Sequence, residues 1–350
     1  MYFTIKKSYC TFFLLSLLIA ISPEGHAEQM DKPAPLGGHS LCEASASTWI
    51  PCPDDSDATC LLVGDNEVGK KLFVFPFHDG RLDVEKRQEL DTTPALSKIK
   101  DIEALTTLRS GEVLVYGSHS RNKRCELKKK RRRYSGLNIK GGEVIAGDIP
   151  FVKTKEKFDL FKSFPKMATG TLQHVRKAVQ KGEEQANYGQ CEAAFNIEGA
   201  VAVPDKAVPD SLNDNVWLGL RAPLVDHKAV LVRHKPGLKT LAFDAAHLID
   251  LKKHGVRDLT YANGWVFVLS GPVEDNTEAP FKLWKFKANA LEQVETINVE
   301  LVLEDVPNSA EGLSIHGNEA IMLMDGGESK NSEKLCETDS TYIIKSMHKM

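Results

Sequence analysis

The chain has 350 residues, of which 42% are hydrophobic, and its formal net charge is −3. This length is enough to bury a large core in one or two domains. So weak a charge balance gives no reason to expect nucleic acid as a partner.

The first 27 residues have the pattern of a secretory signal peptide. Lys6 and Lys7 form a positively charged start, and residues 11–21 are an apolar run too short to span a bilayer. The small residue Ala27 predicts cleavage directly after it, and an uncleaved membrane anchor is the alternative. No later apolar run is long enough for a transmembrane segment, so we expect a periplasmic or secreted protein.

A flexible lead-in and one domain are predicted to follow. Residues 28–40 hold several Pro and Gly, and residues 41–350 read as a single domain. Residues 153–190 interrupt it, because they are charged and lack the alternation of strands. Within them we expect a helix that starts after Thr171 and ends before Gly182. Its apolar face is formed by Leu172, Val175 and Val179.

A short phrase with one carboxylate recurs five times along this domain. Each phrase is followed, about one strand later, by an apolar run that ends in a small residue, as at 113–117. An all-β unit repeated in this way is typical of a β-propeller blade, which needs roughly 40–50 residues. The pattern predicts an all-β propeller of five blades, with six as the alternative. The recurring carboxylates are Glu43, Glu103, Glu198, Asp258 and Glu311.

These five carboxylates are predicted to meet near the propeller axis. Equivalent positions of the inner strands form a ring, and like charges at such short range repel one another. A bound cation would relieve the repulsion, and hard oxygen ligands favour Ca²⁺ or Mg²⁺. In the alternative reading, the carboxylates accept hydrogen bonds from backbone N–H groups and pin the blades together.

A second group of polar residues follows the second strands and is predicted to lie at the same mouth. Arginine side chains match the geometry of phosphate and carboxylate groups, and a histidine can act as a general base. With a cation they would bind an anionic small molecule or hydrolyse a phosphoester or related ester. The competing hypothesis is a non-catalytic binding or scaffold propeller. The predicted ligand-binding residues are Asp65, Arg121, Arg221 and Arg257, and the predicted base is His119.

Basic residues are concentrated between positions 121 and 133, which contain Arg121-Asn122-Lys123-Arg124 and a run of six Lys and Arg at 128–133. A solvated hairpin between two strands is one interpretation. Contact with an anionic lipid, glycan or phosphorylated ligand is the other. The signal peptide argues against a nucleic-acid patch.

Six cysteines follow the signal peptide, and an even number in an exported protein predicts disulfides. Cys52 and Cys60 flank a short polar loop and should pair. The other two expected pairs are Cys125–Cys191 and Cys42–Cys336, and free buried cysteines are the alternative.

Several phrases resemble an uncharacterised bacterial family, domain of unknown function 3616. They are Asp101-Ile102-Glu103-Ala104, Gly117-Ser118-His119-Ser120-Arg121-Asn122-Lys123, Asn196-Ile197-Glu198-Gly199, Leu218-Gly219-Leu220-Arg221-Ala222-Pro223 and Arg257-Asp258-Leu259. The resemblance covers the chain from about Leu41 to Tyr342 and implies a propeller-like β fold without an established activity. The Glu-Gly phrases are also similar to those of esterase-like phytases and other calcium-binding propellers.

Overall fold

The computed structural model describes residues 32–37, 41–66, 68, 70–93, 99–147, 160–205, 214–236, 241–274, 279–327 and 338–347. The predicted signal peptide, Cys336 and the first part of the predicted insertion lie outside these residues.

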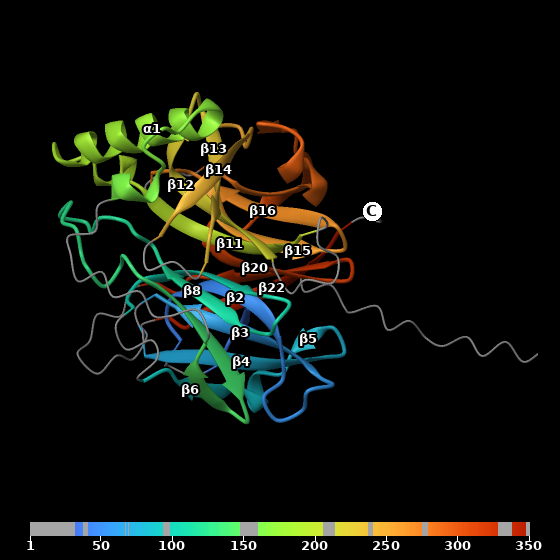
Figure 1. Cartoon of the computed structure of the whole chain (residues 1–350). Helices are drawn as coiled ribbons and strands as arrows, with labels where there is room; N and C mark the ends of the chain where they lie inside the picture. Colours follow the sequence, from blue (N-terminus) through green and yellow to red (C-terminus); the bar gives the residue numbers. More distant parts are fainter. Residues whose placement is uncertain are drawn as a thin grey trace, which may run out of the picture.

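Five small sheets form a five-bladed β-propeller, as the repeated phrase predicts (Figure 1). Each sheet contributes one inner strand, and each inner strand contacts the inner strands of the two neighbouring sheets, so the ring closes. The inner strands are β2 (Ala44–Pro51), β7 (Ile102–Thr107), β11 (Asn196–Pro204), β15 (Gly255–Ala262) and β20 (Ala310–His316).

The first two blades are built in chain order from the axis outward. In the first blade, β2 is followed by β3 (Thr59–Asp65), β4 (Lys71–His78), β5 (Arg81–Leu82) and β6 (Gln88–Asp91), and both β5 and β6 pair with β4. In the second blade, β7 is followed by β8 (Val113–Gly117), β9 (Tyr134–Lys140) and β10 (Glu143–Ala146).

The third blade is completed by a strand that lies, in sequence, between two strands of the fourth. The third comprises β11, β12 (Asp214–Val225), β13 (Lys228–His234), β14 (Phe243–Ile249) and the later strand β18 (Thr296–Ile297). The fourth comprises β15, β16 (Trp265–Gly271), β17 (Phe281–Lys287) and β19 (Glu300–Val306).

The fifth blade is made from both ends of the chain. Strands β20, β21 (Glu319–Met324) and β22 (Thr341–Ser346) come from the C-terminal part, and β1 (Ala34–Pro35) pairs with β22 from the N-terminal part. The first and last blades also meet at the axis, where the hydroxyls of Ser47 and Ser314 are 2.9 Å apart.

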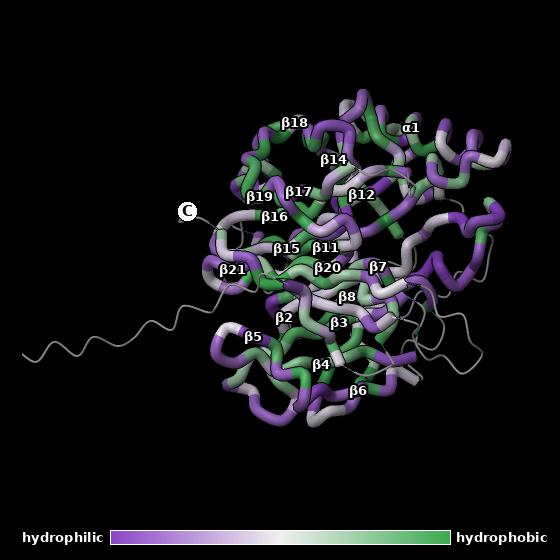
Figure 2. The backbone as a smooth tube through the Cα atoms, turned by 180° about the vertical axis from the view of Figure 1, so that it is seen from behind, coloured by the Kyte–Doolittle hydropathy of each residue, from purple (hydrophilic) through white to green (hydrophobic). Residues whose placement is uncertain are grey.

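The core lies between neighbouring sheets rather than in one central mass. The second strand of each blade is buried on both faces and therefore reads as a continuous apolar run, such as Val266 to Leu269 in β16. Hydrophobic segments follow the strands, and the connecting loops are more hydrophilic (Figure 2).

The described residues include one α-helix, α1 (Gly170–Ala186), which packs against β12 and β14 of the third blade (Figure 1). Its apolar face is the predicted one, since Leu172, Val175 and Val179 are buried. The predicted end at Gly182 is wrong, because this glycine lies inside the helix. A Cβ at Gly182 would lie 2.1 Å from the carbonyl oxygen of Ala193. The backbone at Ala193 approaches the helix so closely that this position requires a glycine.

Four short 3-10 helices complete the described elements. They are η1 (Val84–Lys86), η2 (Leu160–Ser163), η3 (Cys191–Ala193) and η4 (Ala288–Glu292). Two predicted disulfides are confirmed, Cys52–Cys60 and Cys125–Cys191. The first closes the polar loop between β2 and β3. The second joins the loop after β8 to η3, which follows α1 in the chain.

Candidate functional site

The five inner strands share one irregularity at the same place near their start. In each strand one residue is left out of the pairing with the second strand, which makes a β-bulge. Bulges re-aim side chains, and five equivalent bulges aim five side chains at the axis. We call these residues the axial ring. Its members are Ser45, Glu103, Glu198, Arg257 and Glu311.

Three of the five predicted carboxylates therefore belong to the axial ring, and Glu43 and Asp258 do not. Asp258 follows the bulge of its strand and is fully buried. Its two carboxylate oxygens accept backbone N–H groups, from Leu259 at 2.7 Å and from Leu313 of the next blade at 2.6 Å. Asp258 thus pins the fourth blade to the fifth, as the alternative reading of the sequence describes.

Glu43 and Asp65 lie together beside the first blade. Glu43 precedes β2, and its backbone N–H donates to Asp65 Oδ2 at 3.0 Å. Asp65 also accepts the N–H groups of Cys42 at 2.8 Å and Val68 at 2.7 Å. The predicted ligand residue Asp65 is therefore turned toward the backbone, where it fixes the start of β2.

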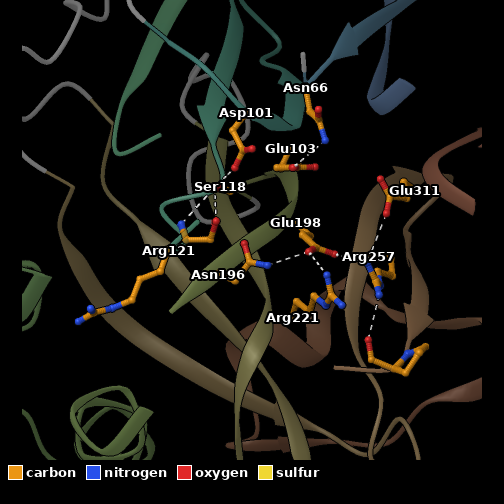
Figure 3. Close-up of polar contacts among 12 residues, drawn as sticks. Asn66, Asp101, Glu103, Ser118, Arg121, Asn196, Glu198, Arg221, Arg257 and Glu311 are labelled. Atoms are coloured by element: carbon orange, nitrogen blue, oxygen red, sulfur yellow. Dashed lines mark hydrogen bonds and ion pairs between the residues drawn. The ribbon is translucent and has the colours of Figure 1, made fainter. Parts of the chain in front are cut away.

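Glu198 is the most heavily paired member of the axial ring (Figure 3). Its Oε1 accepts from Arg221 Nη1 at 3.1 Å and from the side-chain amide of Asn196 at 2.8 Å. Its Oε2 accepts from Arg257 Nη1 at 3.1 Å. Two buried guanidinium groups balance the charge of this carboxylate.

Arg257 on β15 contacts the glutamates of the two neighbouring inner strands, Glu198 on β11 and Glu311 on β20. Its Nη1 lies 3.4 Å from Glu311 Oε1, its Nη2 donates to the carbonyl oxygen of Pro272 at 3.0 Å, and the guanidinium lies over the ring of Phe281. The Glu311 side chain is 24% exposed. Burial among protein atoms raises the pKa of Glu311 to about 7, although Arg257 opposes the shift.

Glu103 lies on the other side of the axial ring and has only one long polar contact described, from Asn66 Nδ2 at 3.5 Å. Burial raises its pKa well above the usual range, and the negative charges of Asp101, Glu311 and Glu198 raise it further. The surroundings of Glu103 therefore favour its protonated form.

Asp101 and Arg131 border Glu103 and were not predicted to belong to the site. Arg131 Nη2 lies 2.8 Å from Asp101 Oδ1, and the hydroxyl of Ser118 donates to Asp101 Oδ2. Burial raises the pKa of Asp101, and the guanidinium of Arg131 opposes this shift.

The predicted residues Arg121 and His119 are used elsewhere in the fold. Arg121 points away from the axial ring in Figure 3 and binds Glu183 on α1 through Nε at 3.0 Å and Nη2 at 2.8 Å. His119 is buried, and its Nδ1 contacts the carbonyl oxygen of Gly117 at 2.9 Å. Burial lowers the pKa of His119 to about 4, so its imidazole is neutral at pH 7.

The axial ring as it stands does not fit the predicted Ca²⁺ or Mg²⁺. Among the described residues, no group of three or more His, Cys, Asp or Glu side chains is arranged to hold a metal ion. The guanidinium of Arg257 lies between Glu198 and Glu311 and supplies the positive charge that we had assigned to a cation.

The sequence does contain a signal that identifies the members of the axial ring. In all five strands the bulged residue follows an apolar residue, as in Ile102-Glu103, Ile197-Glu198 and Val256-Arg257. Alignment on that apolar residue selects Arg257 and Ser45, whereas alignment on the carboxylates selects Asp258 and Glu43.

Fold and site together define a five-bladed β-propeller with a charged axial ring. The family described as "Protein of unknown function (DUF3616)" matches residues 83–342, and the chain belongs to this family. No curated protein matches the sequence. In the part of the chain that the structure describes, no helix is long and apolar enough to cross a membrane. The two disulfides fit a periplasmic or extracellular protein.

Several solved structures are similar in fold. An exo-β-1,3-galactanase from Phanerochaete chrysosporium has 10% identity and a TM-score of 0.45, with 89% of this chain covering 64% of that one. A GH43 endo-arabinanase from Bacillus licheniformis has 10% identity and a TM-score of 0.42, with coverages of 89% and 95%. A six-bladed lectin from Aleuria aurantia has 8% identity and a TM-score of 0.37, with coverages of 82% and 73%. Identities this low say nothing of activity.

Proposed function

We propose that the axial ring is an acid–base site that binds a hydroxyl-rich small ligand and hydrolyses it without a metal ion. One observation carries the proposal: glutamates at equivalent positions of the inner strands have opposite electrostatic surroundings. Glu198 is paired with two arginines, while burial raises the pKa of Glu103 and raises that of Glu311 to about 7. Carboxyl groups placed close together in such contrasting surroundings are characteristic of acid–base catalysis.

The reaction class follows from the pair Glu198 and Glu311. Their oxygens on either side of Arg257 Nη1 are at most about 6.5 Å apart, the sum of 3.1 and 3.4 Å. Hydrolysis of a glycosidic bond uses one carboxylic acid and one carboxylate, roughly 5–9.5 Å apart. In this assignment Glu311, which is open to the mouth, protonates the leaving oxygen. Glu198 acts as the carboxylate that activates water or attacks the substrate.

The surrounding groups suit a hydroxyl-rich substrate. In its protonated form Glu103 can donate a hydrogen bond, and the amides of Asn66 and Asn196 can donate and accept. This assignment replaces the metal-assisted ester hydrolysis that the sequence suggested, because Arg257 already neutralises the carboxylates that would have held the metal.

A second candidate is a non-catalytic binding propeller, and the contacts of Arg257 favour it. This residue on β15 joins Glu198 on β11 to Glu311 on β20, so it holds three blades together. In such a protein the axial ring is a structural clamp and a ligand occupies the mouth without being cleaved.

Hydrolysis assays with purified protein separate the two candidates. The substrates are a panel of nitrophenyl glycosides and soluble polysaccharides, assayed with and without EDTA. We expect turnover that EDTA does not change, and a loss of about 10²–10⁴-fold in kcat for Glu311→Gln and Glu198→Gln. The rate should fall above about pH 7, because Glu311 then loses its proton.

The matched control is Glu304→Gln, since the Glu304 side chain is 67% exposed in an outer-strand ion pair with Lys282. It should leave kcat unchanged. Folding of every variant is checked by its thermal melt. Turnover that survives in folded Glu311→Gln, or that EDTA abolishes, contradicts the acid–base assignment. The absence of turnover across the panel favours the binding propeller.

A further inference from the structure

The basic loop between β8 and β9 lies at the border of the axial ring. Arg131 of this loop forms the ion pair with Asp101 beside Glu103. The backbone N–H of Lys100 donates to the carbonyl oxygen of Lys130 at 3.0 Å, two residues before β7 begins. A ligand seated at the axial ring is therefore flanked by this loop.

The cations of the loop that face solvent include Arg124, Lys128, Lys129 and Lys130. Lys128 pairs with Glu126 at 2.6 Å. Within the described ranges, Arg124, Lys129 and Lys130 have no ion pair. The whole chain has a net charge of −3, so this loop is a local concentration of positive charge on a weakly acidic protein.

The loop is fixed to the helical insertion at two points. The Cys125–Cys191 disulfide joins residues 66 positions apart. Arg121 binds Glu183 on α1, and its Nη1 also donates to the carbonyl oxygen of Cys125 at 2.9 Å. Like charges repel when they are held close together, so a covalently fixed cationic loop costs stability. A fixed loop also loses little conformational freedom on binding, which strengthens its affinity for an anion.

An aromatic residue is exposed on the segment that the disulfide attaches to the loop. Tyr188 lies three residues before Cys191 and is 89% exposed. Its backbone is ordered by an N–H donated to Gln185 at 2.9 Å. Tyrosine gives a large, rigid contact with a polar end and is enriched at binding surfaces.

We infer that these five residues bind an anionic polysaccharide whose neighbouring units reach the axial ring. We call them the rim patch: Arg124, Lys128, Lys129, Lys130 and Tyr188. The inference rests on the proposed function. That proposal names the kind of bond that the axial ring would cleave, and the inference adds that the substrate is negatively charged. A chain of acidic sugars fits better than a lipid surface, since one linear ligand can contact the patch and also enter the mouth beside it.

Binding to polygalacturonate, measured by isothermal titration calorimetry, tests this inference on the full-length mature protein. We expect binding that weakens by at least about tenfold between 20 and 200 mM NaCl, because salt screens exposed charges. The triple variant Arg124→Ser, Lys129→Ser, Lys130→Ser should lose at least about tenfold in affinity, and Tyr188→Ala a few-fold. Neutral dextran should bind at least tenfold more weakly.

The matched control removes three exposed cations from the opposite ends of the strands, Arg81, Lys140 and Lys287. Serine at these positions changes the net charge equally and should change the affinity less than twofold. An equal loss in both triple variants would overturn the inference, as would equal binding of dextran. Binding to vesicles with 30% phosphatidylglycerol, but not to polygalacturonate, would assign the patch to membranes instead.

The inference and the proposed function can fail separately. Glu311→Gln should abolish turnover and leave the affinity for polygalacturonate unchanged. Polygalacturonate that binds through the rim patch but is not cleaved contradicts only the acid–base proposal for this polymer. Turnover of neutral glycosides that the triple variant and 200 mM NaCl leave unchanged, with no binding of polygalacturonate, contradicts only the rim patch.

Discussion

The two sides of the axial ring solve the problem of buried carboxylates differently. On one side, Glu198 is held by the guanidinium groups of Arg221 and Arg257, both nearly buried. On the other side, Glu103 has one long contact from Asn66, and its pKa is raised well above the usual range. One carboxylate is balanced by cations, and the other has surroundings that favour its protonated form. The ring can therefore hold three glutamates close together.

The largest expected effect comes from replacing Arg257, the cation that pairs with both Glu198 and Glu311. Arg257→Leu leaves Glu198 and Glu311 without the charge between them, and the Arg257 side chain is only 5% exposed. Loss of one partner from a buried ion pair costs about 3–5 kcal/mol of unfolding free energy. Urea denaturation measures the change. Glu304→Leu is the control, because the Glu304 side chain is 67% exposed in its pair with Lys282, and it should cost no more than about 1 kcal/mol.

The same substitution on the two sides should act in opposite directions. Glu198→Gln removes the charge that two arginines bind, so the free energy of unfolding should fall by about 2–3 kcal/mol. Glu103→Gln removes a carboxyl group whose charged form is disfavoured by burial, so the stability should be unchanged or higher by about 1 kcal/mol. Thermal and urea melts of both variants check this.

Melts of the same proteins with added Ca²⁺ and with chelator sharpen the comparison. If the wild-type melting temperature rises with Ca²⁺ and Glu198→Gln abolishes the rise, the axial ring does bind a cation. Stabilisation by Glu198→Gln without metal would mean that repulsion among the carboxylates outweighs the arginine contacts.

A smaller effect than those of the arginine and Glu198 variants is a pH dependence that comes from Glu311. Its pKa is about 7 in the folded protein and about 4.5 when unfolded, so the folded state binds the proton more tightly. Stability should therefore fall as the pH rises from about 4.5 to about 7 and then stay level. The loss should be on the order of 1–2 kcal/mol, since the group is partly exposed. Glu311→Gln should remove it, and equal slopes for both proteins in urea melts across this range contradict the assignment.

The sequence was sufficient for most of the fold because a propeller repeats its own pattern. A carboxylate phrase followed by an apolar run, such as Glu198 before the run at 216–219, marks the inner and second strand of a blade. The apolar run is continuous because the second strand is covered on both faces. The helix was also predicted, but its end was not, since Gly182 is required by a contact with Ala193 that no local pattern reveals.

The site was predicted less well, because the strand register decides which side chains face the axis. One residue of shift moves a side chain to the other face of a strand. Asp258 and its neighbour Arg257 differ by that single step, and only the bulge shows which of them faces the axis. The contact between Arg131 and Asp101 was missed for a different reason, since it depends on how a long loop folds back over the mouth.

The seam between the first and last blades has a consequence for how the protein folds. The backbone N–H of Ala44 donates to Ser340 Oγ at 2.9 Å, across 296 positions of sequence, and β1 completes the sheet of β22. Contacts this distant in sequence make folding slow, because the ends of a long chain must first meet. Glu311 lies in β20 of the last blade, so a chain that has not been synthesised past this strand cannot have the complete axial ring. The assembly of the site is thus tied to the synthesis of the last blade.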